Sequence, residues 1–334
     1  MKRVTIADVA NHANVSKSTV SQYINKRYDY MGEETKERIE KTIKELEYSP
    51  NMVAKSLKQK STLTIGVIVA NILHVFSTQV IRAIEDVCQE NDFHVIVCNA
   101  DDNPEKEKKY IEMLRAKQVD GMIVFPTGGN KDLYESLFNE GYPLIFVDRF
   151  VENLPIDSIL LDNEAAAKLA VDHFVSKGYE RIAILTTSII RNITPRVERI
   201  SGYKKALQAS GIPIREEYIK SLDLNEIHNG LKEMLFAEHP PQAILAGNDL
   251  TLMQILNFVQ EHKIQIPKEL ALIGIDELSF ANIYSPSLTI VSQPTFEMGE
   301  MAASLLLKKV KKEDTKNEGC IHRLQPTLVI RESC

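Results

Sequence analysis

The chain has 334 residues, 44% of them hydrophobic, so it can bury a sizeable core and exceeds the length of one typical domain. It contains no run of about 18 apolar residues, which excludes an ordinary transmembrane helix, and its N-terminus lacks the pattern of a secretory signal, so we expect a cytoplasmic protein. The net charge of −6 excludes only a wholly basic protein, and the four cysteines have no spacing typical of a metal or redox site.

The charge is distributed unevenly along the chain. Residues 1–60 carry twelve Lys and Arg against eight Asp and Glu, a net charge of +4, whereas residues 61–334 carry 28 against 38, a net charge of −10. A small positive module on an acidic chain is typical of proteins that contact nucleic-acid phosphates locally. We therefore expect any contact with DNA in the first part of the chain.

Three short helices are predicted in residues 1–49. Thr5 is the expected N-cap of the first helix because Asp8 follows three residues later, and this helix runs from Ile6 to about Ala13. Asn14 tolerates the left-handed conformation of a tight turn. Two helices joined by such a turn are typical of a helix-turn-helix unit.

The second predicted helix begins after Ser16, a good N-cap, and reaches Asn25. Val20 and Ile24 are four residues apart and face inward. The outer face carries hydrogen-bonding side chains near the start of the helix, where a recognition helix meets base edges. These outward residues are Lys17, Ser18, Ser21 and Gln22.

A third helix is predicted from Glu33 to Glu47, with Ile39, Ile43 and Leu46 on its buried face. Three helices around one small core form a DNA-binding headpiece at residues 1–49. Residues 50–60 are then a hinge helix or linker. A helix of about seven residues is too short to be stable alone in water, so we expect it to form only when something packs against it.

From residue 63 onward, short β-branched runs alternate with helical stretches, a pattern typical of parallel sheets covered by helices. Because the runs form two series, we expect residues 61–334 to contain two doubly wound α/β subdomains with a cleft between them. The first series comprises 64–69, 93–97, 121–125 and 143–148, and the second comprises 181–185, 243–246 and 270–276.

The motifs VTIxDVA at 4–10, AxVSxSTVS at 13–21, TxxRI at 35–39 and YxPNxxA at 48–54 resemble the LacI/GalR family of bacterial repressors. The later part of the chain resembles the sugar-binding core of that family, which is similar to periplasmic binding proteins, and this resemblance extends to residue 333. Within the family the sequence is most similar to repressors of ketodeoxygluconate operons.

The resemblance implies roles for residues of the headpiece and the hinge. Lys17, Ser18 and Gln22 are the implied base readers. The implied phosphate contacts or helix caps are Thr5, Ser16, Thr19, Ser21 and Asn25. In the hinge, Asn51 is the expected N-cap, and Ala54 and Leu57 match the positions from which the family's hinge helix, paired with that of its dimer partner, inserts a leucine into the minor groove of the operator. The alternative for the hinge is a flexible linker with an incidental leucine.

Two departures from the family pattern stand out in the headpiece. Most members carry arginine where this chain has Gln22, and glutamine suits adenine whereas arginine suits guanine, so we expect a different base at that operator position. The loop at residues 26–32 is also longer by one residue and more aromatic than in some relatives, which is expected to alter backbone contacts with DNA rather than the fold.

Polar side chains follow the predicted strand ends, where ligands of such sheets bind. By resemblance to the family, Arg199, Asn248 and Asp276 bind the effector, and Leu161 packs against it. Neighbouring polar groups complete the predicted effector site: Asp148, Arg149, Arg191 and Arg196. Because arginine binds carboxylates bidentately, four arginines near one cleft favour a sugar acid over a neutral sugar. For Asp162 and Asp249 the competing interpretation is a helix cap.

These features together predict a sequence-specific transcriptional regulator. We expect a homodimeric repressor of a carbohydrate or sugar-acid operon that leaves its pseudo-palindromic operator when the effector binds, with no membrane partner. The alternatives are a catabolite-control regulator that uses a phosphoprotein corepressor, and a sugar-binding protein without a regulatory role. Since neither GxGxxG nor GxSxG occurs, we expect no enzyme and no cofactor. The C-terminus lacks a heptad tail, so a tetramer formed through one is not expected.

Overall fold

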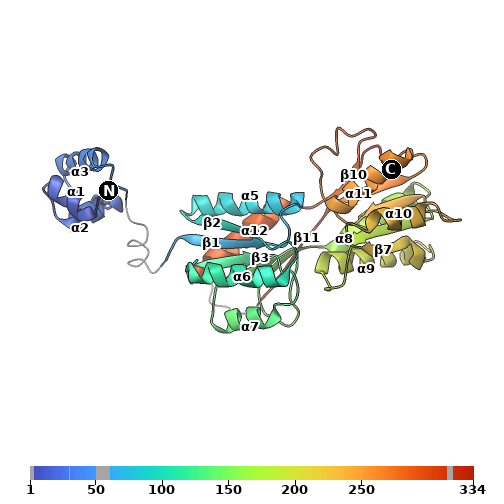
Figure 1. The fold of residues 1–334 in the computed structure, drawn as a ribbon, viewed down its shortest axis with the longest axis horizontal. Coiled ribbons are helices and arrows are strands. Elements are labelled where there is room, and N and C mark those ends of the chain that lie inside the picture. The colour runs from blue at the N-terminus through green and yellow to red at the C-terminus, as the bar shows by residue number, and fades with distance from the viewer. Residues whose placement is uncertain (1–3, 30, 50–60, 314–318) are drawn as a thin grey trace. The chain divides into compact units, whose positions relative to one another are not determined.

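The structure is a computed structural model that describes residues 4–29, 31–49, 61–313 and 319–334. The chain divides into two units, residues 1–62 and 63–334, which Figure 1 draws as ribbons. The predicted hinge segment 50–60, with Asn51, Ala54 and Leu57, lies outside the described residues. No helix in the described ranges is long and apolar enough to cross a membrane.

The first unit is a three-helix headpiece formed by α1 (Ile6–His12), α2 (Lys17–Ile24) and α3 (Glu33–Glu45). Its core contains Val9, Val20 and Ile39, which are fully buried. The predicted inward face of α2 is therefore confirmed. The third helix ends two residues before the predicted Glu47, because Glu47 adopts a left-handed conformation with φ of 47°.

Local hydrogen bonds fix the predicted helix-turn-helix. Thr5 and Asp8 form a capping box, in which the backbone N–H of Thr5 donates to the Asp8 carboxylate at 2.8 Å. Asn14 has a φ of 50°, the left-handed conformation predicted for the turn. Ser16 caps α2 by accepting from the backbone N–H of Thr19 at 3.1 Å.

The second unit contains two six-stranded sheets, each at the centre of one subdomain. In the first subdomain the strand order is β11-β5-β4-β3-β1-β2, and all neighbours are parallel. The strands are β1 (Thr64–Val69), β2 (His94–Asn99), β3 (Gly121–Val124), β4 (Leu144–Val147), β5 (Ser158–Leu161) and β11 (Ile321–Leu324). The helices are α5 (Val75–Glu90), α6 (Pro104–Ala116), α7 (Lys131–Asn139) and α12 (Thr295–Val310).

In the second subdomain the strand order is β12-β10-β9-β8-β6-β7, and only the β10–β12 pair is antiparallel among the strands described. The strands are β6 (Ile182–Thr187), β7 (Ile219–Leu222), β8 (Ala243–Ala246), β9 (Ala271–Ile275), β10 (Thr289–Ser292) and β12 (Thr327–Val329). The helices are α8 (Asn163–Ser176), α9 (Thr194–Ala209), α10 (Ile227–Leu235) and α11 (Asp249–His262), with a short 3-10 helix η1 (Glu216–Tyr218).

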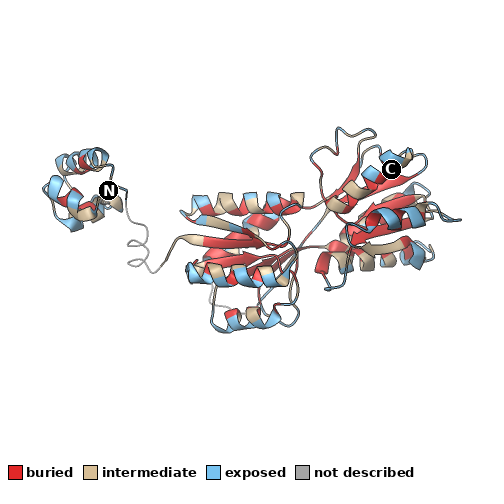
Figure 2. Ribbon diagram, viewed as in Figure 1, coloured by how far each residue is buried: buried red, intermediate tan, exposed pale blue. Residues whose placement is uncertain are grey.

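Helices cover both faces of each sheet, which is why the central strands are continuous apolar runs (Figure 2). In the first subdomain α5 and α12 pack on one face and α6 and α7 on the other. In the second, α10 and α11 cover one face and α8 and α9 the other. The predicted doubly wound α/β architecture of both subdomains is confirmed.

The sequence prediction of the strands was incomplete. The run at 93–97 is predicted as a buried parallel strand. Instead, β2 pairs only with β1, lies at the edge of its sheet and leaves Val97 40% exposed. The strands β5, β7, β10, β11 and β12, each of three or four residues, were not predicted. The chain also crosses between the subdomains three times, after β5, β10 and β11, so neither subdomain is continuous in sequence.

Candidate functional site

The outer face of α2 is the candidate DNA interface of the headpiece. Lys17, Ser18 and Gln22 are exposed there, while Val20 is buried on the opposite side. The start of α2 thus presents one cation, one hydroxyl and one amide in two turns of helix. Their chemistry suits base edges and phosphates, as the sequence predicted.

Other predicted DNA contacts also serve the headpiece fold. The Ser16 hydroxyl lies 2.6 Å from that of Ser18 and 2.8 Å from that of Thr19, and the Asn25 amide donates to the Ser21 carbonyl at 2.7 Å. Thr5 likewise belongs to its capping box. Each of these residues is therefore placed as a helix cap or a cap neighbour, which is one of the two roles that the sequence left open.

The aromatic loop after α2 is held by contacts inside the headpiece. The Tyr28 ring lies 5.9 Å from the Tyr23 ring in an edge-on arrangement, and Lys36 Nζ lies 4.8 Å from the centre of the Tyr28 ring. The cation is therefore positioned by a π face, an attraction of about 0.5–1 kcal/mol at an exposed site. These contacts attach the loop to α2 and α3.

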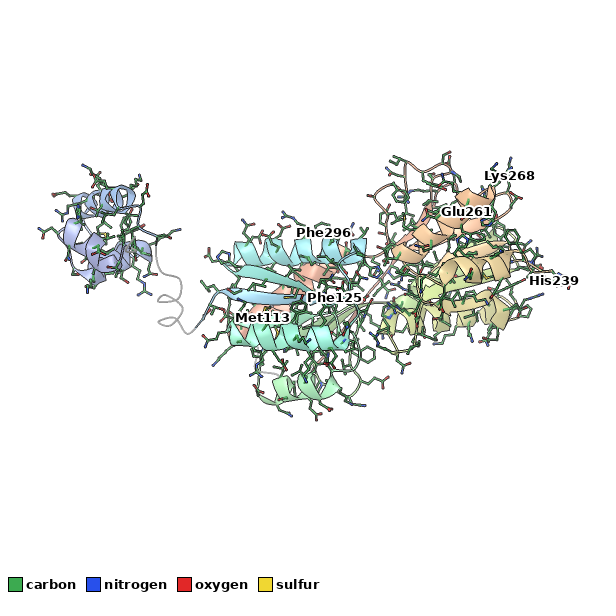
Figure 3. The ribbon with its side chains drawn as sticks, in the orientation of Figure 1. Met113, Phe125, His239, Glu261, Lys268 and Phe296 are labelled. Atoms are coloured by element: carbon green, nitrogen blue, oxygen red, sulfur yellow. The ribbon has the colours of Figure 1, made fainter. Side chains whose placement is uncertain are left out.

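Strand ends from both subdomains converge on a small cavity of about 40 Å³, called here the central cavity. Phe125, at the carboxyl end of β3 (Figure 3), lines it from the first subdomain. Six of the eight predicted effector residues also line it, and they come from both subdomains. They are Asp148, Arg149, Arg196, Arg199, Asn248 and Asp276.

Arg199 lies on α9 and is only 3% exposed. Its Nε donates to Asn163 Oδ1 at 2.9 Å and its Nη1 donates to the Gly247 carbonyl at 2.5 Å. These two bonds go to an amide and a carbonyl rather than to a carboxylate. Two neighbours therefore fix the plane of the guanidinium at the wall of the central cavity, and neither of these bonds is to a carboxylate.

Asp276 follows β9 and adopts a left-handed φ of 83°, a strained conformation for a residue with a side chain. Gln293 donates to Asp276 Oδ1, and the buried Oε1 of Gln293 has no hydrogen-bond partner among the described residues. The pKa of Asp276 is raised, mainly because the carboxyl group is buried. The positive charge of Arg199 opposes this shift, and the negative charge of Asp249 adds to it. The pair thus offers a carboxyl and an unpartnered amide oxygen at the cavity.

Asn248 both caps α11 and faces the central cavity. Its Oδ1 accepts from the backbone N–H of Thr251 at 2.8 Å, and its Nδ2 donates to Thr187 Oγ1 at 3.2 Å. The cap that the sequence considered at Asp249 is therefore made by Asn248. At the other candidate position, Asp162 does cap α8, by accepting from the backbone N–H of Ala165 at 2.9 Å.

Asp102, which the sequence analysis did not single out, pairs with the predicted arginines. Its carboxylate lies 2.8 Å from Arg149 Nη1 and 3.5 Å from Arg196 Nη2, so it joins the two subdomains. Burial by itself would raise the pKa of Asp102, but the charges of Arg149 and Arg196 have the larger effect, so the pKa is lowered. Burial and the nearby Arg149 lower the pKa of Arg196 to about 10. Asp148 adds a second carboxylate, 3.4 Å from Arg149 Nε.

A larger cavity of about 300 Å³, called here the outer cavity, adjoins the central one and shares Asn71, His74 and Arg196 with it. Arg191 lines the outer cavity but not the central one, is exposed, and donates to the backbone carbonyl of Asp102. Together the two cavities are lined by four arginines and four aspartates. These are Arg149, Arg191, Arg196 and Arg199 with Asp102, Asp148, Asp223 and Asp276.

His74 and Asp249 form a second connection between the subdomains that the sequence did not predict. His74 Nδ1 lies 2.5 Å from Asp249 Oδ1, and the backbone N–H of Val75 donates to Asp249 Oδ2 at 2.8 Å. Burial lowers the pKa of His74, but Asp249, Asp276 and Asp102 outweigh burial and raise it. The position of Asp249 after a strand end was a signal for a place in the site, but nothing in the sequence pointed to its distant partner, His74.

Leu161 is placed differently from the prediction. It is 1% exposed and belongs to the apolar core of the second subdomain, where it packs with residues of α8 and α9. It does not line either cavity. The reason is that β5 leads directly into α8, so its last side chain is covered by the helix layer before the chain reaches the cavity.

A helix-turn-helix headpiece joined to two α/β subdomains with a polar cavity between them defines a class, the DNA-binding regulators that carry a ligand-binding core. Residues 5–51 match the family described as bacterial regulatory proteins, lacI family, and residues 171–334 match a periplasmic binding protein-like domain.

Relatives match along almost the whole chain. The probable HTH-type transcriptional regulator EndR of Paenibacillus polymyxa is 48% identical, with 98% of each chain covered, and the HTH-type transcriptional regulator KdgR of Bacillus subtilis is 34% identical over 98% and 97%. The structure of the Lac repressor dimer bound to operator and the anti-inducer ONPF is 26% identical, with a TM-score of 0.85 and 99% of each chain covered. The chain therefore belongs to the LacI family of bacterial transcriptional regulators.

Proposed function

We propose that this LacI-family regulator is a cytoplasmic repressor that binds a pseudo-palindromic operator as a homodimer and leaves it when a small polyhydroxylated ligand occupies the central and outer cavities. The observation that carries the proposal is the position of these cavities. Their walls come from both subdomains, which Asp102 and Asp249 connect by ion pairs. A ligand there changes the contacts between the subdomains, and such a change is the kind of two-state element that can control a distant interface.

The chemistry of the cavity walls supports a sugar. Arg199 and Asn248 offer fixed donors, and Asp276 with Gln293 offers acceptors, which together match a row of hydroxyl groups. Arginines and aspartates are equal in number around the two cavities. The aspartates therefore balance the surplus of arginine that favoured a sugar acid. If the ligand is a sugar acid, we expect its carboxylate to bind Arg199, whose own hydrogen bonds go to an amide and a carbonyl.

The proposed DNA contacts follow from the headpiece. We assign Lys17, Ser18 and Gln22 to base edges, with the capping residues around them near phosphates. One headpiece reaches one half-site, so two copies are needed for a pseudo-palindrome. The relative solved as a dimer on its operator supports this arrangement.

The decisive experiment measures operator binding at one salt concentration while neutral sugars and sugar acids are added singly. The operator is a duplex selected by the full-length protein from random DNA. We expect one ligand class to lower operator affinity at least about tenfold, a change of about 1.4 kcal/mol, and Arg199→Met to abolish that response. Arg82→Met, an exposed arginine on α5, is the matched control and should respond as the wild type does.

Two results would contradict the proposal. One is an operator affinity that no member of the panel changes. The other is an increase in operator affinity when a serine-phosphorylated carrier protein is added without any sugar. This result would mean that a phosphoprotein corepressor, rather than a small ligand that releases the operator, controls DNA binding.

A further inference from the structure

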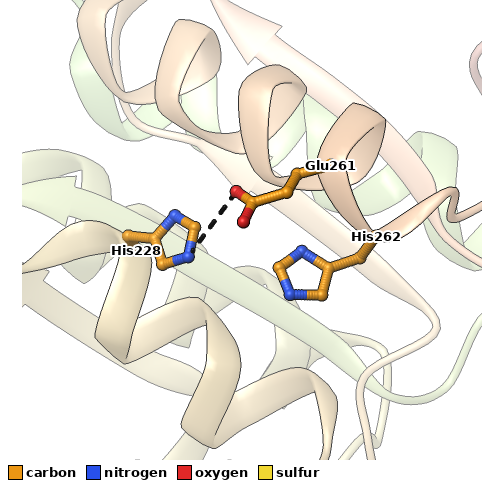
Figure 4. A group of neighbouring side chains, drawn as sticks. All are labelled: His228, Glu261 and His262. Carbon is orange, nitrogen blue, oxygen red and sulfur yellow. Dashed lines mark ion pairs between the residues drawn. The ribbon is translucent and has the colours of Figure 1, made fainter.

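Three residues with metal-binding side chains meet on the surface of the second subdomain. His228 lies near the start of α10, and Glu261 with His262 ends α11, as Figure 4 shows. One ligand atom from each residue lies within 4.8 Å of the other two, and His228 Nε2 is 3.8 Å from a Glu261 carboxylate oxygen. None of the three lines the central or the outer cavity.

The ring of His262 is held in place by Phe258, four residues earlier on the same helix. Its Nδ1 lies 3.0 Å from the backbone carbonyl of Phe258, and because a carbonyl only accepts, Nδ1 carries the proton of that bond. In the neutral ring the lone pair is then on Nε2. The ring also stacks on Phe258 at a centroid distance of 4.1 Å. A backbone carbonyl bonded to the second ring nitrogen is the usual support of a metal-binding histidine.

The helix end adds a favourable field. Glu261 and His262 occupy the last turn of α11, where unpaired carbonyl groups concentrate partial negative charge. A carboxylate at this end is repelled by that charge, whereas a cation is attracted by it. A bound cation therefore relieves an unfavourable placement of Glu261.

The three ligand atoms lie close enough together for small side-chain rotations to form a metal site. Ligand atoms of a tetrahedral zinc site with bonds of about 2.0–2.1 Å are separated by about 3.4 Å. The separations of up to 4.8 Å between one ligand atom of each residue exceed this by no more than about 1.4 Å. The side chains of His228 and Glu261 are 46% and 63% exposed, so such rotations meet little steric resistance.

We propose that His228, Glu261 and His262 bind one divalent transition-metal ion, with zinc as the expected ion, and that this ion ties α10 to α11. Two imidazole nitrogens and one carboxylate oxygen are ligands typical of zinc, nickel or copper, whereas magnesium and calcium prefer oxygen alone. Water completes the coordination. The ion is separate from the effector, so this proposal stands or falls independently of the proposed function.

The test uses the full-length protein carrying Cys320→Ser, since Cys320 is an exposed thiol and thiols are zinc ligands. Calorimetry with zinc and absorption spectra with cobalt are expected to show saturable binding of one ion per chain. His228→Ala and His262→Ala should each weaken binding at least about tenfold, by analogy with losses at other metal sites. His94→Ala, which removes an exposed histidine of β2 outside the cluster, should leave the affinity unchanged.

Equal affinity in the wild type and both alanine variants would overturn the proposal, as would the absence of zinc and cobalt binding by a protein whose circular dichroism shows it to be folded. If an alanine variant fails to fold, Glu261→Gln replaces it, because this change keeps both rings and the size of the third side chain. It too is expected to weaken binding, and unchanged affinity in this variant counts against the site.

Discussion

At the scale of single residues, Arg199 has two tasks in one side chain. It bonds Asn163 and the Gly247 carbonyl, so it holds α8 and the end of β8 together, and it presents its charge to the central cavity. If the proposed function is correct, ligand binding and folding therefore share this residue. The same holds for Asn248, which caps α11 while facing the cavity.

Replacing Arg199 with methionine is expected to lower the free energy of unfolding by about 1–3 kcal/mol, because the Gly247 carbonyl and the Asn163 amide lose a buried partner. Thermal unfolding of the full-length protein measures the loss. The exposed Arg82→Met serves as the control and should stay within about 0.5 kcal/mol of the wild type. A stability equal to that of the control would show that these two hydrogen bonds contribute little.

A second prediction at the residue scale concerns the base that Gln22 reads. Gln22→Arg should move the base preference at one operator position from adenine towards guanine, with a change in discrimination of about 1–3 kcal/mol. Binding to operators that differ at each position in turn measures this shift. If the preference is the same in the variant and the wild type, Gln22 does not read a base. A uniform change across all sequences would instead indicate a phosphate contact.

At the scale of elements, the position of α2 depends on its N-cap. The Ser16 hydroxyl accepts from the backbone N–H of Thr19 and also lies close to the hydroxyls of Ser18 and Thr19, all at the start of the helix that we propose faces the DNA. The start of a recognition helix is therefore ordered by a side chain that the sequence identifies without any distant contact.

Ser16→Ala should destabilise α2 by about 1 kcal/mol, whereas Ser16→Asn, which also caps well, should recover most of that loss. Hydrogen exchange of the α2 amides in the full-length protein reports the effect. Equal protection in the wild type and the alanine variant would mean that packing of Val20, rather than the cap, holds the helix.

At the scale of the whole ligand-binding unit, the two subdomains are joined by groups that titrate. His74 has a pKa raised above its ordinary 6.5, because Asp249, Asp276 and Asp102 outweigh burial, and Asp249 has a pKa lowered below its ordinary 3.8, because its bonds to His74 and Val75 outweigh burial. The folded protein therefore holds the His74 proton more tightly than the unfolded chain does. This pair adjoins both cavities through His74.

The stabilisation from His74 is complete below about pH 6.5 and is lost as the pH rises through the raised pKa of the folded protein. The contribution of Asp249 is lost only in acid, as the pH falls below its ordinary pKa. We expect the melting temperature of the wild type to fall more between about pH 6 and pH 9 than that of His74→Asn. Parallel pH profiles for the two proteins would contradict the assignment to His74.

Sequence alone determined the features that depend on neighbours along the chain. The caps at Thr5 and Ser16, the left-handed turn at Asn14 and the buried side of α2 each involve residues no more than four positions apart. The two subdomains, with polar groups at the strand ends, were equally predictable, because parallel strands must be apolar where helices cover them and expose polar residues where they end.

The tertiary structure alone decided how those polar groups are partnered. Asp102 neutralises arginines that had suggested an acidic ligand, and His74 meets Asp249 across 175 positions of sequence. Leu161 enters the core because a helix follows β5 at once. Such contacts depend on which strands are neighbours and where the chain crosses between subdomains, and an ion pair between distant residues leaves no periodic pattern in the sequence.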